Sequence, residues 1–103
     1  MSTEVIDDIK IDETIKREIK EPSDYNVIML NDDGTPMEWV VQVLQQIYHH
    51  SIKSAQELML TIHTDGSAVV GTYKYEIAEQ KALETVNASR NQGFPLQCKV
   101  EEE

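Results

Sequence analysis

The chain has 103 residues, a formal net charge of −10 at pH 7 and an apolar fraction of 40%. That length suits one domain with a modest core, and no apolar run is long enough to span a membrane. The acidic surface argues against binding nucleic acids or anionic membranes, and it favours a cationic partner such as a free amino group.

Residues 1–24 are polar and mixed in charge, with only isolated isoleucines. Such a stretch buries too little apolar surface to form a stable helix alone. We therefore predict a flexible N-terminal arm over residues 1–24, bounded by Pro22, and a folded domain over residues 25–103. The N-terminus is acidic and lacks a signal-peptide pattern, and the single cysteine, Cys98, excludes an internal disulfide, so we expect a cytoplasmic protein.

The first part of the domain predicts a strand followed by a helix. Residues 25–30 form a short apolar run rich in strand formers. Thr35 and Glu38 have the spacing of a capping box, which would place Pro36 at the first helical position. Apolar residues at helical spacing then mark one face of this helix: Val40, Val43, Leu44, Ile47 and Tyr48.

The second part predicts a helix, a strand, another helix and a last strand. After a break at residues 49–51, the second helix ends near Gly66 and has an apolar stripe of Ala55, Leu58, Met59, Ile62 and His63. Residues 67–73 predict a strand, and residues 74–90 predict a helix that ends at Gly93. Alternating Leu96, Cys98 and Val100 predict the final strand. The order β-α-α-β-α-β indicates an α+β fold, with three helices packed on one face of a three-stranded antiparallel sheet.

Two features could carry function. The polar triplet Asn31, Asp32 and Asp33 follows the first strand directly, and on local grounds it indicates a turn, since Asp33-Gly34 favours chain reversal. His63 ends an otherwise apolar stripe, where a histidine is more often a core residue or a helix-terminus partner than a catalytic group. Either feature could instead supply hydrogen-bonding groups at the edge of a binding site.

Metal and thiol chemistry have little support. His49 and His50 are adjacent and would point apart on a helix, and the acidic triplet lacks the spacing of a calcium loop, so we expect no metal and no cofactor. Cys98 lies on the apolar face of its strand, which predicts a buried, unreactive thiol. Met37 and Met59 face inward, either as core residues or as the adaptable wall of a cavity.

Several motifs occur together in one order: NDD-x-TPMEWV from Asn31, LMLTIH ending at His63, G-x-Y followed by E-I-A-E-x-K, and FPL-x-C near the end. With these motifs, the segment from residue 25 to residue 100 resembles the ClpS family. Members of that family are adaptors that hand N-degron proteins to the Clp AAA+ protease.

The resemblance implies a site for a substrate's first residue. Asn31, Asp32 and His63 would hold its free α-ammonium group. A deep apolar pocket would take a Leu, Phe, Tyr or Trp side chain, and its implied lining is Thr35, Met37, Val40, Met59, Ile62 and Leu96. Met37 would exclude side chains branched at Cβ. Ile62 replaces a common valine, and Gly34 replaces a frequently bulkier residue, which predicts a narrower floor and a looser rim.

The resemblance also implies docking on the N-terminal domain of a ClpA-type AAA+ chaperone. The matching positions at the start of the third helix are Glu76, Glu79 and Lys81, although composition alone indicates an ordinary solvated face. The arm would reach toward the chaperone pore.

We therefore expect a non-enzymatic adaptor. One competing hypothesis is a small hydrolase or transferase that uses His63 as a general base beside Asp32, although the sequence offers it no convincing nucleophile. The other is a regulatory domain with an unknown ligand.

Overall fold

The computed structural model describes residues 23–103. They form three strands and three helices in the predicted order: β1 (Asp24–Leu30), α2 (Met37–Gln46), α3 (Ile52–Asp65), β2 (Ser67–Lys74), α4 (Tyr75–Asn91) and β3 (Gln97–Glu102). The α+β prediction is confirmed. The predicted arm lies outside the described residues except for its last two positions, of which Asp24 already belongs to β1.

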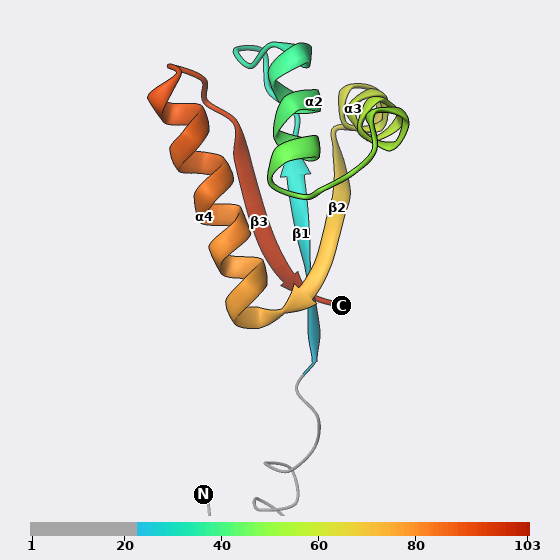
Figure 1. Ribbon diagram of the computed structural model, residues 1–103, viewed down its shortest axis with the longest axis vertical. Coiled ribbons are helices and arrows are strands. Elements are labelled where there is room, and N and C mark those ends of the chain that lie inside the picture. The colour runs from blue at the N-terminus through green and yellow to red at the C-terminus, as the bar shows by residue number, and fades with distance from the viewer. Residues whose placement is uncertain (1–22) are drawn as a thin grey trace, which may run out of the picture.

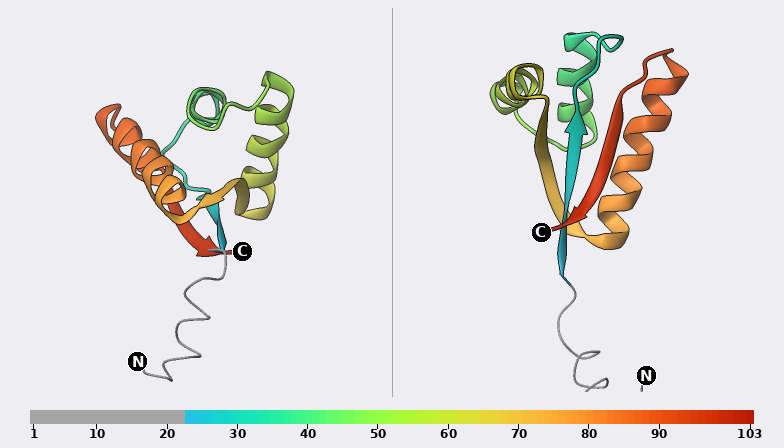
Figure 2. Two further views of the ribbon diagram at one scale, coloured as in Figure 1. Left: turned by 60° about the horizontal axis from the view of Figure 1, so that its bottom comes forward. Right: turned by 180° about the vertical axis from the view of Figure 1, so that it is seen from behind.

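The sheet has the strand order β2-β1-β3, and β1 pairs antiparallel with both neighbours. Leu30 lies opposite Ser67 and Gln97 at one end of the sheet, and Asp24 lies opposite Lys74 at the other. The three helices cover one face, with α2 between α3 and α4 (Figures 1 and 2). Since α2 follows β1 closely, it begins at the Leu30 end.

The core lies between the sheet and the helices. Val27 and Met29 alternate along β1 and are fully buried, as the period of a strand requires. Ala78 and Ala82 on α4 are also buried, and their small side chains let this helix lie close to the sheet. Burying each large apolar side chain contributes about 1.5–3 kcal/mol.

The predicted capping box at the start of α2 is wrong. Pro36 is the N-cap residue, with extended backbone angles (φ −66°, ψ 146°), and the helix has no side-chain cap. The Thr35 hydroxyl instead donates to Asp32 Oδ2 at 2.9 Å. A charged carboxylate is a stronger acceptor than a neutral group, so it holds this hydroxyl in the preceding turn.

The two ends of α3 are set by local signals. Ser51 caps the helix by accepting a hydrogen bond from the Ser54 N–H at 3.1 Å, and the predicted end at Gly66 is confirmed, with φ at 95°. The Gly66 carbonyl then accepts the Asn31 N–H at 2.9 Å. The end of α3 is therefore joined to the segment that leaves β1.

The loop from α4 to β3 is anchored at the end of α4 and on α2. Gly93 (φ 84°) closes α4 in a Schellman motif, in which the Phe94 N–H donates to the Ser89 carbonyl at 2.9 Å. The Phe94 ring packs against Trp39, with centroids 5.6 Å apart, and Trp39 Nε1 donates to Ser89 Oγ at 2.8 Å. These contacts fix the loop against α2.

No helix within residues 23–103 is long and apolar enough to cross a membrane.

Candidate functional site

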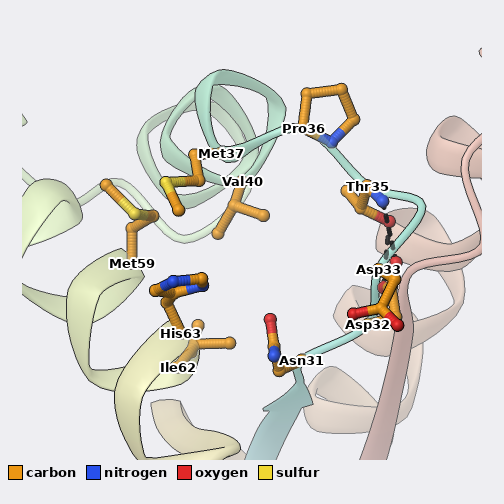
Figure 3. Close-up of a pocket in the computed structure, with 10 residues that line it drawn as sticks. All are labelled: Asn31, Asp32, Asp33, Thr35, Pro36, Met37, Val40, Met59, Ile62 and His63. Carbon is orange, nitrogen blue, oxygen red and sulfur yellow. Dashed lines mark hydrogen bonds between the residues drawn. The ribbon is translucent and has the colours of Figure 1, made fainter.

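A pocket of about 330 Å³ opens at the Leu30 end of the sheet. Its walls come from the β1–α2 connection, the start of α2 and the C-terminal half of α3 (Figure 3). Its volume falls in the range of roughly 300–1,000 Å³ that is typical of small-ligand sites. The residues that line it are Asn31, Asp32, Asp33, Thr35, Pro36, Met37, Val40, Met59, Ile62 and His63.

Asn31 and His63 form the polar mouth of this pocket. Both are exposed, and Figure 3 shows the Asn31 side chain pointing into the pocket with the His63 ring across from it. The amide offers a carbonyl oxygen, and a neutral imidazole offers one ring nitrogen as an acceptor. The pair can therefore accept hydrogen bonds from one donor group placed between them.

The hydrogen bonds of Asp32 confirm that the polar triplet forms a turn. Its Oδ1 accepts the Gly34 and Thr35 N–H groups at 2.8 and 2.7 Å, and its Oδ2 accepts the Thr35 hydroxyl. These hydrogen bonds orient the Asp32 carboxylate toward Thr35. The turn also lines the pocket, so Asp32 both shapes the turn and places a negative charge at the rim.

The apolar part of the pocket comes from the two helices. Met37, the first residue of α2, is 44% exposed, whereas Val40 and Ile62 are buried. Met59 reaches the pocket from α3 and is partly buried. The inward-facing residues of α2 and α3 therefore meet at the pocket, and the two methionines give the pocket wall an adaptable surface.

Leu96 is the one residue of the predicted pocket set that does not line this pocket. It is 1% exposed and lines a smaller cavity of about 10 Å³, which shares Asn31, Asp32, Thr35, Val40 and Ile62 with the larger one. The sequence prediction also omitted Asp33 and Pro36 from the lining. Both are neighbours of predicted residues, and the turn brings them to the rim.

The predicted docking positions lie on α4, away from the pocket. Glu76 and Glu79 are exposed, and Glu79 accepts a hydrogen bond from the Tyr75 hydroxyl at 3.2 Å. Lys81 is partly buried, and its Nζ donates to the Ile47 carbonyl at 2.8 Å while lying 5.4 Å from the Tyr73 ring centroid. Lys81 therefore ties the end of α2 to α4.

Groups for covalent catalysis are scarce around the pocket. Burial raises the pKa of the Cys98 thiol from its ordinary 9.0 to about 11, and Cys98 does not line the pocket. Among the described residues that line the pocket, Thr35 carries the side-chain hydroxyl group, and this hydroxyl already donates a hydrogen bond to Asp32. Within residues 23–103, no three His, Cys, Asp or Glu side chains are grouped to hold a metal ion. The arrangement favours binding.

Comparisons with known proteins place this chain among Clp protease adaptors. The family model of the ATP-dependent Clp protease adaptor protein ClpS matches residues 20–99. The chain belongs to the ClpS family. The ClpS adapter of Treponema denticola is 48% identical over 87 residues, covering 84% of this chain and 86% of that protein. The ClpS adapter of Maricaulis maris is 46% identical over 84 residues, covering 82% and 77%.

The fold of this ClpS-family chain also matches a solved structure. Agrobacterium tumefaciens ClpS2 bound to L-phenylalaninamide is 41% identical and has a TM-score of 0.78, covering 81% of this chain and 100% of that one. The ligand of that protein combines a free amino group with a benzyl side chain. The resemblance found in the sequence is confirmed, and the chain is an adaptor of the ATP-dependent Clp protease.

Proposed function

We propose that this adaptor binds proteins whose N-terminal residue is Leu, Phe, Tyr or Trp and delivers them to a Clp AAA+ chaperone in the cytoplasm, without catalysing a reaction itself. The observation that carries this proposal is the pocket mouth. Asn31 and His63 lie across from each other above an apolar cavity, and Asp32 adds a negative charge at the rim.

The mouth suits an α-ammonium group. That group has a positive charge and three N–H donors, which need acceptors. Asn31 and His63 supply two acceptors, and a charge-assisted hydrogen bond contributes about 1.5–3 kcal/mol. Asp32 already accepts three hydrogen bonds. A carboxylate has roughly four acceptor positions, so one is left for the ligand.

The cavity suits the side chain of the same residue. Burying a large apolar side chain against Val40 and Ile62 contributes roughly 1.5–3 kcal/mol. With the amine contacts, the gross gain is on the order of 5–12 kcal/mol before the cost of association, which makes binding reversible. The binding of L-phenylalaninamide by A. tumefaciens ClpS2 supports this combination of amine and aromatic groups.

Met37 sets a steric limit at the pocket. It lies at the first position of α2 and lines the pocket beside Val40. A ligand side chain branched at Cβ is wide just where it leaves the backbone, so it would press against Met37. We expect Ile- and Val-initiated chains to bind weakly for this reason.

The proposal is tested by titrating peptides that differ only in their first residue. Peptides that begin with Leu, Phe, Tyr or Trp should bind, whereas a Gly-initiated peptide should not, because it leaves the cavity empty. Met37→Ala should admit Ile, and Leu60→Ala is a matched control, since Leu60 is 55% exposed and lies outside the pocket. Equal binding of Leu- and Gly-initiated peptides would contradict the proposal.

A second contact would carry the substrate to the protease. We infer that the start of α4 docks on the N-terminal domain of a ClpA-type chaperone through Glu76 and Glu79, with Lys81 at the edge of the surface. The exposure of both carboxylates supports this assignment. Lys81 is the weakest of the three positions, because its ammonium group already bonds Ile47.

A further inference from the structure

A second groove lies beside the start of α2, and we call it the Trp39 groove. It has a volume of about 460 Å³, and the residues that line it are Pro36, Glu38, Trp39, Gln42, Gln92 and Phe94. They come from the start of α2 and from the loop that follows α4. Figure 1 shows both segments at the end of the molecule where β1 ends and the pocket opens.

Two aromatic rings form the walls of the Trp39 groove. Trp39 and Phe94 are both partly buried, and their ring centroids are 5.6 Å apart. Trp39 Nε1 donates to Ser89 Oγ at 2.8 Å, so the indole is held in place where it lines the groove. A cation placed over the face of an indole ring is attracted to it, and tryptophan is the best aromatic partner for this contact.

The polar residues of the groove also suit a cation. Glu38 supplies a carboxylate, and Gln42 and Gln92 supply amide oxygens as acceptors. All three side chains are exposed, so a ligand can reach them. None of the six residues that line the groove carries a positive charge. Aromatic walls beside a carboxylate therefore favour a basic side chain, lysine or arginine.

Pro36 joins the Trp39 groove to the pocket, because it lines both. Met37 lines the pocket and Trp39 lines the groove, and residues two positions apart lie about 200° apart around a helix axis. A helix with its side chains is about 10–12 Å wide, and an extended chain covers about 3.3–3.6 Å per residue. A substrate that fills the pocket with its first residue and crosses Pro36 therefore reaches the groove near its fourth or fifth residue.

We propose that the Trp39 groove binds a lysine or arginine side chain at the fourth or fifth residue of the bound substrate. This inference rests on the proposed function, since the pocket fixes where the substrate chain begins. The basic group lies over the Trp39 indole with its charge beside the Glu38 carboxylate. The acidic surface attracts basic segments in general, whereas the groove selects a basic residue at one distance from the N-terminus.

An arginine scan along one peptide tests this position. Each peptide begins with Phe, continues in Gly and Ser, and carries one Arg between its second and eighth residues. Arginine at the fourth or fifth residue should raise the affinity by roughly threefold to tenfold, the combined effect of an exposed cation–π contact and an exposed ion pair. Arginine at the eighth residue should raise it less, because only the general attraction acts there. An equal gain at every position, or a larger gain from Leu than from Arg at the fourth and fifth, would overturn the proposal.

Glu38→Gln removes the charge from the groove with little change in shape. It should reduce the gain from a well-placed arginine by roughly twofold or more and leave the affinity for the peptide without arginine unchanged. Glu57→Gln is the matched control, because Glu57 is exposed on α3, lines neither the pocket nor the groove, and loses the same charge. Equal reductions in the two variants would contradict a contact at Glu38.

Fluorescence of Trp39, the single tryptophan of the chain, gives a direct readout of the groove. A saturating peptide with arginine at its fourth residue should change the emission, because the guanidinium group lies against the indole. L-phenylalaninamide is too short to reach the groove and should leave the emission nearly unchanged. No change with the peptide, or an equal change with both ligands, would refute the assignment. Failure of the proposed function is distinguishable, because Phe- and Gly-initiated peptides without arginine would then bind equally.

Discussion

Asn31 and His63 come from separate elements, and one backbone bond brings them together. The Asn31 N–H donates to Gly66 O, just beyond the end of α3, while His63 lies in the last turn of that helix. Gly66 closes α3 with a positive φ that other residues rarely adopt. The position of the pocket mouth therefore depends on a glycine cap as well as on the two side chains.

Binding should depend on the acceptor that His63 presents to the ligand. The neutral imidazole offers one ring nitrogen as an acceptor, whereas an alanine side chain offers none. His63→Ala should therefore weaken the affinity for a Leu-initiated peptide by roughly tenfold or more, the factor of one lost charge-assisted hydrogen bond. Calorimetric titration measures the effect.

His63→Gln is the control for this variant. The glutamine amide keeps an acceptor at this position, so the affinity should lie closer to that of the unchanged protein. Unchanged binding by His63→Ala would exclude the acceptor role.

The sequence supported two interpretations of Asp32, and both describe part of its environment. Local chemistry indicated a turn, and the Asp32 carboxylate does accept hydrogen bonds from Gly34 and Thr35 within this turn. The resemblance implied a rim position, and Asp32 does line the pocket. The sequence could not predict that Pro95 lies close to Gly34, where an added Cβ atom would be 2.9 Å from Pro95 Cγ, because these residues are far apart in the chain.

Helix ends were predictable where one local signal acts alone. Gly66 and Gly93 each end a helix with positive φ, as expected. The start of α2 was mispredicted because Thr35 had a choice between the helix and the Asp32 carboxylate. The bulge between Val27 and Ile28 in the pairing of β1 with β2 was not predicted either, since it depends on the register between two distant strands.

Helix α4 offers a direct test of chaperone docking. Glu79→Lys should weaken binding to the N-terminal domain of a ClpA-type chaperone by about tenfold or more, because it reverses a charge at the proposed contact. Peptide binding should be unaffected. Glu79 is preferable to Glu76, whose charge favours the first turn of α4, and to Lys81, whose bond to Ile47 stabilises the fold.

Glu57→Lys is a matched control for this variant. Glu57 is exposed on α3, and its reversal changes the net charge of the chain by the same amount. Surface-plasmon measurements of both variants separate a local contact from general electrostatic attraction. Equal loss of chaperone binding in the two variants would contradict docking at the start of α4.

At the scale of the whole molecule, the two proposed contacts lie at opposite ends of the sheet. The pocket lies at the Leu30 end, whereas β2 ends at Lys74, opposite Asp24, and α4 begins there (Figure 1). The described chain also enters β1 at that second end. We therefore expect the adaptor to hold a substrate N-terminus and a chaperone at the same time.

The fold and most of the pocket lining were predictable because hydrophobic periodicity and the family motifs extend over the whole domain. The directions of individual side chains were not. The resemblance implied that Leu96 lines the pocket, yet Leu96 is buried and lines the smaller cavity next to it. The net charge of −10 was informative at this scale, since an acidic surface attracts an ammonium group from a distance.

The most direct test of the central claim compares a Phe-initiated peptide with its N-acetylated form by calorimetric titration. Acetylation removes the positive charge and leaves one N–H donor, while the aromatic side chain is unchanged. Because at least two charge-assisted hydrogen bonds are lost, affinity should fall by roughly a hundredfold or more. Equal affinity for the two peptides would show that Asn31, Asp32 and His63 do not bind an amine.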